Sequence, residues 1–207
     1  MATKTELALS MYDAAEYEHS KHEWKDKPYL YMVGLGILEL AMALARERCE
    51  DPEFMLGVAA LRDVARMAGE KPDGETVGTI SAEWGARVAD AVSALTPNPF
   101  LEKSERLADQ LKRVKRQGKE VCMVFLAARA AELDCTYEVY DSEAGAFDQE
   151  AKMLEEFLTE SEYVLRELGE ASPALARRIN EQIKTRRWEL WHRRRKEIRE
   201  GRKENES

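Results

Sequence analysis

The chain has 207 residues with a net charge of −8; 44% of them are apolar and 35% are charged, which is typical of a soluble globular protein and excludes a disordered one. No apolar run approaches the roughly 20 residues that cross a bilayer, and the first residues lack the apolar core of a secretion signal. We therefore expect a cytoplasmic protein with no membrane span. The three cysteines, Cys49, Cys122 and Cys135, are unclustered, which favours reduced thiols over disulfides or a zinc site.

The sequence predicts an all-α protein. Strand-like alternation of apolar and polar residues is scarce, and the helix-favouring residues Ala, Leu, Glu, Arg and Lys dominate. Breaks rich in Pro and Gly divide the chain into helices that we expect at about residues 5–22, 30–45, 52–64, 79–95, 102–116, 119–133, 153–168 and 173–200.

Several helix ends have recognisable signals. Asp51 followed by Pro52 predicts an N-cap with proline at the first helical position. Thr79 or Ser81 is expected to cap the next helix. The final residues, 201–207, are expected to fray, because they are polar and lie at a chain end.

Four segments, in this order, carry a resemblance to a known family: Lys27–Leu30, Ala59–Met67, Trp84–Thr96 and Phe125–Leu133. They resemble the motifs TPYI, ALLHDxxED, FGxxVxxLVxxLT and KLADRLxNL of the hydrolase domain of RelA/SpoT-type alarmone hydrolases, which share the plan of the HD-domain superfamily. The resemblance implies a compact HD-domain-like helical bundle over residues 1–170. Residues 171–207, a basic C-terminal helix with a frayed tail, would be an addition to it.

The metal ligands of that family are largely absent from this sequence. In the resemblance, the two metal-binding histidines fall on Met32 and Arg62, the last metal-binding aspartate falls on Ala128, and only Asp63 is kept. Active members hold one divalent ion, usually manganese, which activates a water for attack on phosphorus. A guanidinium offers no lone pair to a metal. The resemblance therefore implies a catalytically inactive pseudoenzyme without a metal or other cofactor.

The matched pocket keeps several charged residues, with two interpretations. The pair that acts on the water in the family falls partly on Arg66, and its asparagine falls on Glu132. Arg62, Asp63 and Arg66 could form an arginine-lined pocket that binds phosphate, or a salt-bridge cluster that fills the vacated metal site. We favour the cluster, with Asp63 or Glu132 as partner of a buried arginine. Arg129 would contact phosphate or lie on the surface.

Three residues lie where the family's nucleotide pocket begins. Trp24, Lys25 and Tyr29 could stack on a base and contact a phosphate, although aromatics near helix starts more often belong to a core. His19 and His22 are spaced i, i+3, so they could face one side of the first helix. No third metal ligand is evident beside them, and we expect no metal there.

The last predicted helix is strongly basic. Residues 177–203 hold twelve Lys and Arg against four Asp and Glu, so this segment has a net charge of +8 and the rest of the chain −16. Trp188, Trp191, Arg187 and Arg194 are candidates for binding a partner, anionic lipid or nucleic acid. The alternative is a helix packed on the acidic body with its tryptophans buried.

The sequence leaves three alternative functions open. The first is an inactive HD-fold protein that binds a protein partner, a guanine nucleotide or an alarmone, as a sensor, sponge or inhibitor. The second is an enzyme with relocated, metal-independent phosphoester or nucleotide chemistry, for which Asp63 and Glu132 are the acid–base candidates. The third is binding of nucleic acid or an anionic surface through the basic helix, which we rank last because the body is acidic.

Overall fold

The computed structural model describes residues 3–21, 23–24, 27–69, 72–135 and 147–204. Apart from the two-residue antiparallel strands β1 (Glu23–Trp24) and β2 (Lys27–Pro28), its regular structure in these ranges is helical, so the all-α prediction is confirmed. The helices are α1 (Lys4–His19), α2 (Tyr29–Leu44), α3 (Pro52–Leu61), α4 (Val64–Met67), α5 (Glu75–Trp84), α6 (Ala86–Leu95), α7 (Lys103–Gln117), α8 (Lys119–Cys135), α9 (Phe147–Leu168), a 3-10 turn (Gly169–Ala171) and α10 (Pro173–Glu204).

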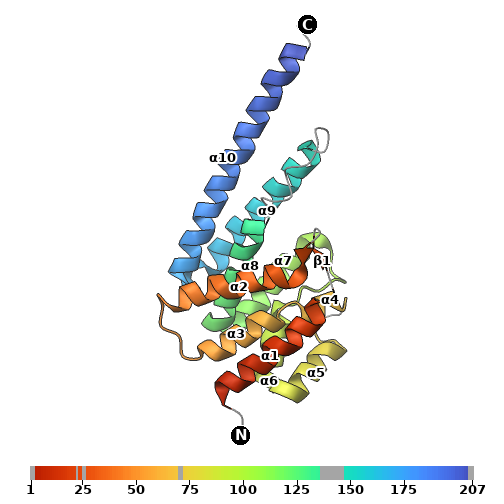
Figure 1. Cartoon of the computed structure of the whole chain (residues 1–207), viewed down its shortest axis with the longest axis vertical. Coiled ribbons are helices and arrows are strands. Elements are labelled where there is room, and N and C mark those ends of the chain that lie inside the picture. The colour runs from red at the N-terminus through yellow and green to blue at the C-terminus, as the bar shows by residue number, and fades with distance from the viewer. Residues whose placement is uncertain (1–2, 22, 25–26, 70–71, 136–146, 205–207) are drawn as a thin grey trace.

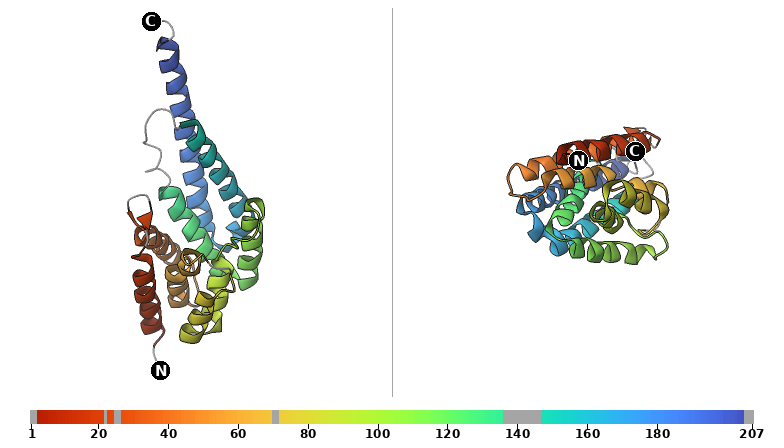
Figure 2. Two further views of the ribbon diagram at one scale, coloured as in Figure 1. Left: turned by 90° about the vertical axis from the view of Figure 1, so that its right-hand side faces the viewer. Right: turned by 90° about the horizontal axis from the view of Figure 1, so that it is seen from below.

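Helix α8 forms the centre of the core. Its stretch from Val121 to Ala131 is buried on all sides, as expected for a helix that is apolar around its whole circumference. Helices α2, α3, α7, α9 and α10 pack around it, and α1 packs on α3 at the periphery (Figures 1 and 2). Three of the matched segments, Ala59–Met67, Trp84–Thr96 and Phe125–Leu133, therefore contribute side chains to one helical core.

Two predicted helix boundaries were wrong. The single helix expected over 79–95 is two helices, because Gly85 adopts a φ of 89° that ends α5 and starts α6. The cap of α5 is Gly74, well before Thr79 and Ser81. Similarly, the helix expected to run through 52–64 ends at Leu61 and resumes in α4.

Asp51 is the N-cap residue of α3 by position, as predicted, but its side chain does not cap the helix. Its carboxylate instead accepts from the guanidinium of Arg87 on α6 at 2.7 Å and pairs with Lys4 of α1 at 3.2 Å. Burial raises the pKa of Asp51, but the hydrogen bonds and charges of Arg87 and Lys4 together hold it below its usual range. The carboxylate thus joins three helices in place of satisfying a backbone amide.

Helix α10 continues past the body alongside α9 (Figures 1 and 2). Leu175, Ile179 and Ile183 recur every fourth residue and are buried against α8 and α9. Fraying was expected from residue 201, but the helix runs to Glu204; residues 205–207 lie outside the described part. Among the helices described, none has the length and apolarity that a bilayer crossing requires.

Candidate functional site

The turn between α3 and α4 brings together the arginines and the aspartate singled out in the sequence. The two carboxylate oxygens of Asp63 accept one bond each, from Nε of Arg62 at 2.9 Å and from Nε of Arg66 at 2.8 Å. Arg62 is only 4% exposed, whereas Arg66 is 40% exposed. The predicted ion pairs are therefore present, with one arginine fixed in the interior and the other at the surface.

The guanidinium of Arg62 packs against the backbone of α2. A Cβ atom added to Gly36 would overlap Nη1 of Arg62 and lie 3.3 Å from its Cζ. Gly36 is one turn after Met32, the position of the family's first metal-binding histidine in the resemblance, and Met32 is itself buried. The absence of a side chain at Gly36 is what gives the guanidinium its place between α2 and α3.

A pocket of about 180 Å³ remains beside this cluster. Its lining comes from the α3–α4 turn, the end of α6, α7 and α8: Arg62, Asp63, Arg66, Leu95, Pro97, Gln110, Phe125, Ala128, Arg129 and Glu132. Three arginines and two acids leave one positive charge in excess on the lining. Five of the predicted pocket residues thus line one pocket, although they are up to 70 positions apart in the chain.

Arg129 is not a surface residue, which corrects one of its two interpretations. It is buried on α8, its guanidinium lies 4.5 Å from the ring centre of Phe157, and its Nε lies 3.5 Å from the carboxylate of Glu132. Gln110 was not predicted; its amide donates to the carbonyl of Leu95. The sequence feature that could have identified Gln110 is its position as a polar residue on the inner side of an amphipathic helix.

The donor set at this turn does not fit the divalent ion that the family resemblance implies. Asp63 is the one ligand kept, and both of its oxygens already accept bonds from guanidinium groups. Two fixed positive charges beside it repel a cation. Within the described residues, no three His, Cys, Asp or Glu side chains are grouped as metal ligands would be.

His19 lies next to this turn and is fully buried. Its Nε2–H donates to the carbonyl of Ala60 on α3 at 3.1 Å. Burial lowers the pKa of His19, and the charges of Arg62 and Arg66 lower it further, against the opposing effects of Ala60 and Asp63. The imidazole is therefore a neutral core group that fixes α1 to α3. His22 lies outside the described residues.

We expect protein stability to fall as pH drops below about 6.5, the usual pKa of an unfolded-state histidine. The unfolded chain then takes up a proton that folded His19 resists, so acid favours unfolding. Urea unfolding between pH 7.5 and 5.5 measures this. His19→Gln should flatten the dependence, while His192→Gln, at an exposed position on α10, should retain it. If the stability of wild type and of His19→Gln changes with pH in the same way, His19 is not the source of the pH dependence.

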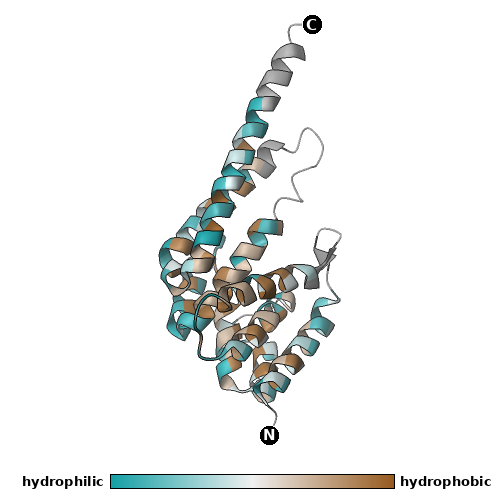
Figure 3. Cartoon of the chain, turned by 60° about the vertical axis from the view of Figure 1, so that its left-hand side comes forward, coloured by the Kyte–Doolittle hydropathy of each residue, from teal (hydrophilic) through white to brown (hydrophobic). Residues whose placement is uncertain are grey.

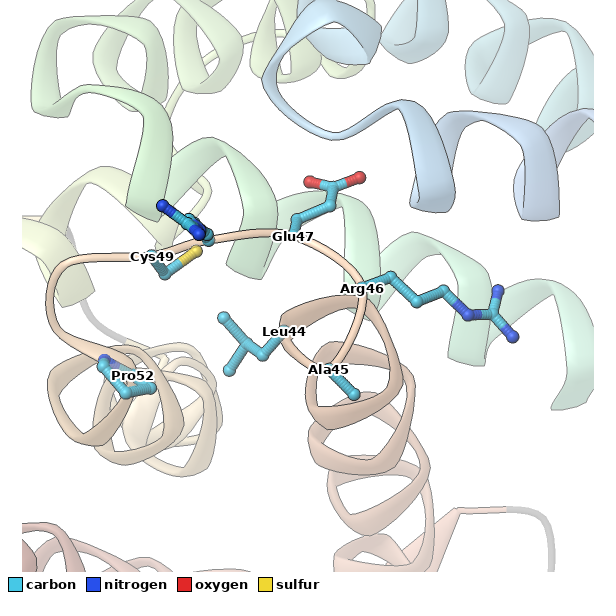
Figure 4. A pocket seen from close by; sticks show the side chains of 7 residues that line it. Leu44, Ala45, Arg46, Glu47, Cys49 and Pro52 are labelled. Carbon is cyan, nitrogen blue, oxygen red and sulfur yellow. The ribbon is translucent and has the colours of Figure 1, made fainter.

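The other predicted residues lie apart from the pocket or outside the described side chains. Trp24 belongs to β1 and Tyr29 begins α2, but neither side chain is described, and Lys25 lies outside the described residues. A second hollow of about 390 Å³ lies at the α2–α3 connection (Figure 4). Its Glu47 accepts from the hydroxyl of Ser172 and the amide of Ala174, which anchors the start of α10. We therefore assign this hollow a structural role.

The tryptophans of α10 are exposed, which corrects the alternative in which packing on the body buries them. Trp188 is 62% and Trp191 50% exposed, on a helix whose outer side is mostly hydrophilic (Figure 3). Arg194 is exposed as well. Arg187 differs, because it pairs with Glu155 and Glu162 on α9. The basic helix thus neutralises acids of the body along one side and presents aromatics on another.

The comparisons with known proteins agree with this fold. No protein-family model matches the chain, and no curated protein matches its sequence. A solved structure described as a metazoan orthologue of SpoT that hydrolyses ppGpp and plays a role in starvation responses superposes with a TM-score of 0.68. The match covers 90% of this chain and 98% of that one at 19% sequence identity, which is evidence about the fold alone. The chain therefore has the fold of an HD-domain alarmone hydrolase, as its resemblance to the RelA/SpoT type predicts.

Proposed function

We propose that this protein is an inactive HD-fold protein that acts by binding, and that the pocket at the α3–α4 turn takes the phosphate groups of a guanine nucleotide or alarmone without a metal. The observation that carries the proposal is the pairing of Arg62 and Arg66 with Asp63, at the position where the resemblance requires a metal-binding histidine and aspartate. Guanidinium groups bind phosphate oxygens but generate no nucleophilic water.

The size and charge of the pocket support a phosphate ligand. A lining with one excess positive charge attracts an anion, and Arg66 is exposed enough to turn from Asp63 toward a ligand. The pocket volume of about 180 Å³ is below the roughly 300–1,000 Å³ of typical small-molecule sites. We infer that one or two phosphate groups enter it, while a base and a ribose would lie outside.

Relocated enzyme chemistry is the weaker alternative. A general base needs a lone pair that can accept a proton from the reacting group. Asp63 has both oxygens engaged with arginines, and Glu132 lies 3.5 Å from Nε of Arg129. These contacts favour carboxylates that stay ionised beside their arginines over carboxylates that accept and release a proton. A metal-independent reaction would need one of these carboxylates to leave its partner.

Calorimetry against inorganic pyrophosphate, guanosine tetraphosphate and GTP, with a chelator present, tests the binding. We expect Arg66→Ala to weaken it about 10- to 100-fold, because one charge-assisted hydrogen bond of about 1.5–3 kcal/mol is lost from a partly exposed site. Arg116→Ala removes an exposed arginine of α7 and should leave the affinity unchanged.

Two results would overturn the proposal in different ways. If none of the three ligands binds, the proposal that the pocket takes phosphate groups is wrong, while the proposal of an inactive HD-fold protein still stands. Hydrolysis of guanosine tetraphosphate by manganese-loaded protein, with turnover that stops when a chelator removes the metal, would show an enzyme. Retained affinity in Arg66→Ala would place the ligand at another surface.

A further inference from the structure

A face of α10 combines tryptophans with exposed cations. Lys184, Trp188, Trp191 and Arg195 are spaced i, i+4, i+7 and i+11, and all four are exposed. We call them the α10 face. Between residues 182 and 195 no exposed side chain is a carboxylate, since Glu189 is partly buried and bound to Arg186.

The α10 face is ordered rather than a random scatter of surface groups. The ring of His192 packs edge-on against Trp188 and Trp191, with centroid distances of 4.0 and 4.8 Å, and the guanidinium of Arg195 lies 4.6 Å from the Trp191 ring. Ring packing of this kind holds two large aromatic surfaces in a fixed position. Such a preformed aromatic surface in water is typical of an interaction site.

A complementary face lies on α1. Leu9, Tyr12, Asp13 and Glu16 are spaced i, i+3, i+4 and i+7 and are all exposed, Leu9 by 58%. We call them the α1 face. In the part of the chain that the structure describes, neither Asp13 nor Glu16 has an ion-pair partner. Each face thus presents two apolar or aromatic groups and two charges, and the charges have opposite signs.

Lys4 and Lys21, near the two ends of α1, do not cancel the negative charge that makes the α1 face complementary to the α10 face. Lys4 pairs with Asp51 at 3.2 Å, and Lys21 pairs with Glu18 at 2.9 Å while lying over the ring of Tyr17. Both cations are therefore already compensated within the chain. The exposed α1 face keeps a net negative charge toward solvent.

We propose that the α10 face of one molecule docks on the α1 face of a second copy of this chain. The two faces lie toward opposite ends of the long axis, so one chain cannot bring them together (Figures 1 and 2). The contact joins different surfaces and is heterologous, which produces a ring or an open chain of molecules rather than a closed two-fold dimer. The α1 face is acidic and the α10 face is basic, which favours a second copy of the chain as the partner. A nucleic acid is less suitable, because the acidic body would repel it.

Sedimentation velocity of the full chain over about 10 µM to 0.5 mM tests association, because a contact between two single helix faces is small and weak. We expect an average mass that rises with concentration beyond a dimer and falls at 0.5 M salt, since the charge pairs are exposed and screened. A monomer at every concentration would overturn the proposal.

Two face variants make the test specific. Trp188→Ala with Arg195→Glu breaks the α10 face, and Asp13→Lys with Glu16→Lys breaks the α1 face. Each variant alone should be monomeric, and their equimolar mixture should form a dimer that grows no further, because only one intact pair of faces remains. The control Lys112→Glu with Arg116→Glu reverses two exposed charges on α7 and should assemble like wild type.

The remaining outcomes are decisive as well. Circular dichroism and melting confirm that the variants are folded, as substitutions of exposed side chains should be. Assembly by either face variant alone, or a mixture that stays monomeric, would overturn the head-to-tail contact. Binding of single-stranded RNA or anionic vesicles by a monomeric wild type would also overturn it and assign the α10 face to an anionic partner. None of these readouts depends on a ligand in the pocket.

Discussion

Asp63→Ala is expected to reduce the free energy of unfolding by about 3–5 kcal/mol, the usual cost of removing one partner from a buried ion pair. The substitution takes the carboxylate from Arg62, whose side chain is 4% exposed, while Arg66 can turn to water. Urea denaturation followed by circular dichroism measures the change. A protein that acts through this cluster depends on Asp63 for its fold, so the same variant is a poor test of binding.

The control for this effect is Glu156→Ala. Glu156 pairs with Lys103 at 3.6 Å, with both side chains largely exposed. Exposed pairs contribute about 0–1 kcal/mol, so this variant should unfold close to wild type. A loss of similar size in the two variants would mean that the Asp63 pair is no more buried in solution than a surface pair. An unchanged stability in Asp63→Ala would show that Arg62 does not rely on this carboxylate.

Gly36→Ala is expected to destabilise the protein by about 1–3 kcal/mol, the range for overpacking a filled interior. The new Cβ would overlap Nη1 of Arg62, whose side chain is only 4% exposed and packs on the backbone of α2. The guanidinium would have to leave its place on α2, which disturbs its bond to Asp63 as well. Chemical denaturation gives the stability.

Gly34→Ala, two positions earlier on the same helix, is the control. A Cβ there meets no atom within 4 Å, and alanine favours a helix over glycine by about 0.5–1 kcal/mol. The two glycine substitutions should therefore shift stability in opposite directions. If both variants are more stable than wild type, the Arg62 side chain moves away from the new Cβ without a cost in stability. The close packing of its guanidinium on α2 would then be wrong.

That the side chains of Arg62 and Ala128 offer no metal ligand could be predicted from the residue types alone. An arginine has no lone pair wherever it lies, so Arg62 at the histidine position cannot be a metal ligand whatever surrounds it. The same holds for Ala128. The all-α class followed from Pro and Gly breaks and apolar periodicity, whereas the HD-domain-like fold followed from the resemblance of four segments in the right order. The spacing could not give the split at Gly85, since a helix pattern of apolar residues continues across it.

The sequence by itself determined an all-α chain and the lack of a metal-binding lone pair at Arg62 and Ala128, because these depend on local propensity and on the chemistry of single side chains. Only the tertiary structure decided that Arg62 is held on Gly36, that Arg129 is buried at the same pocket, and that Trp188 is exposed. Periodicity identifies which face of a helix is apolar but not which neighbour covers it. Leu190 is buried although it lies between the exposed Trp188 and Trp191, so the neighbouring helices cover one side of α10 at this point and leave the other in water.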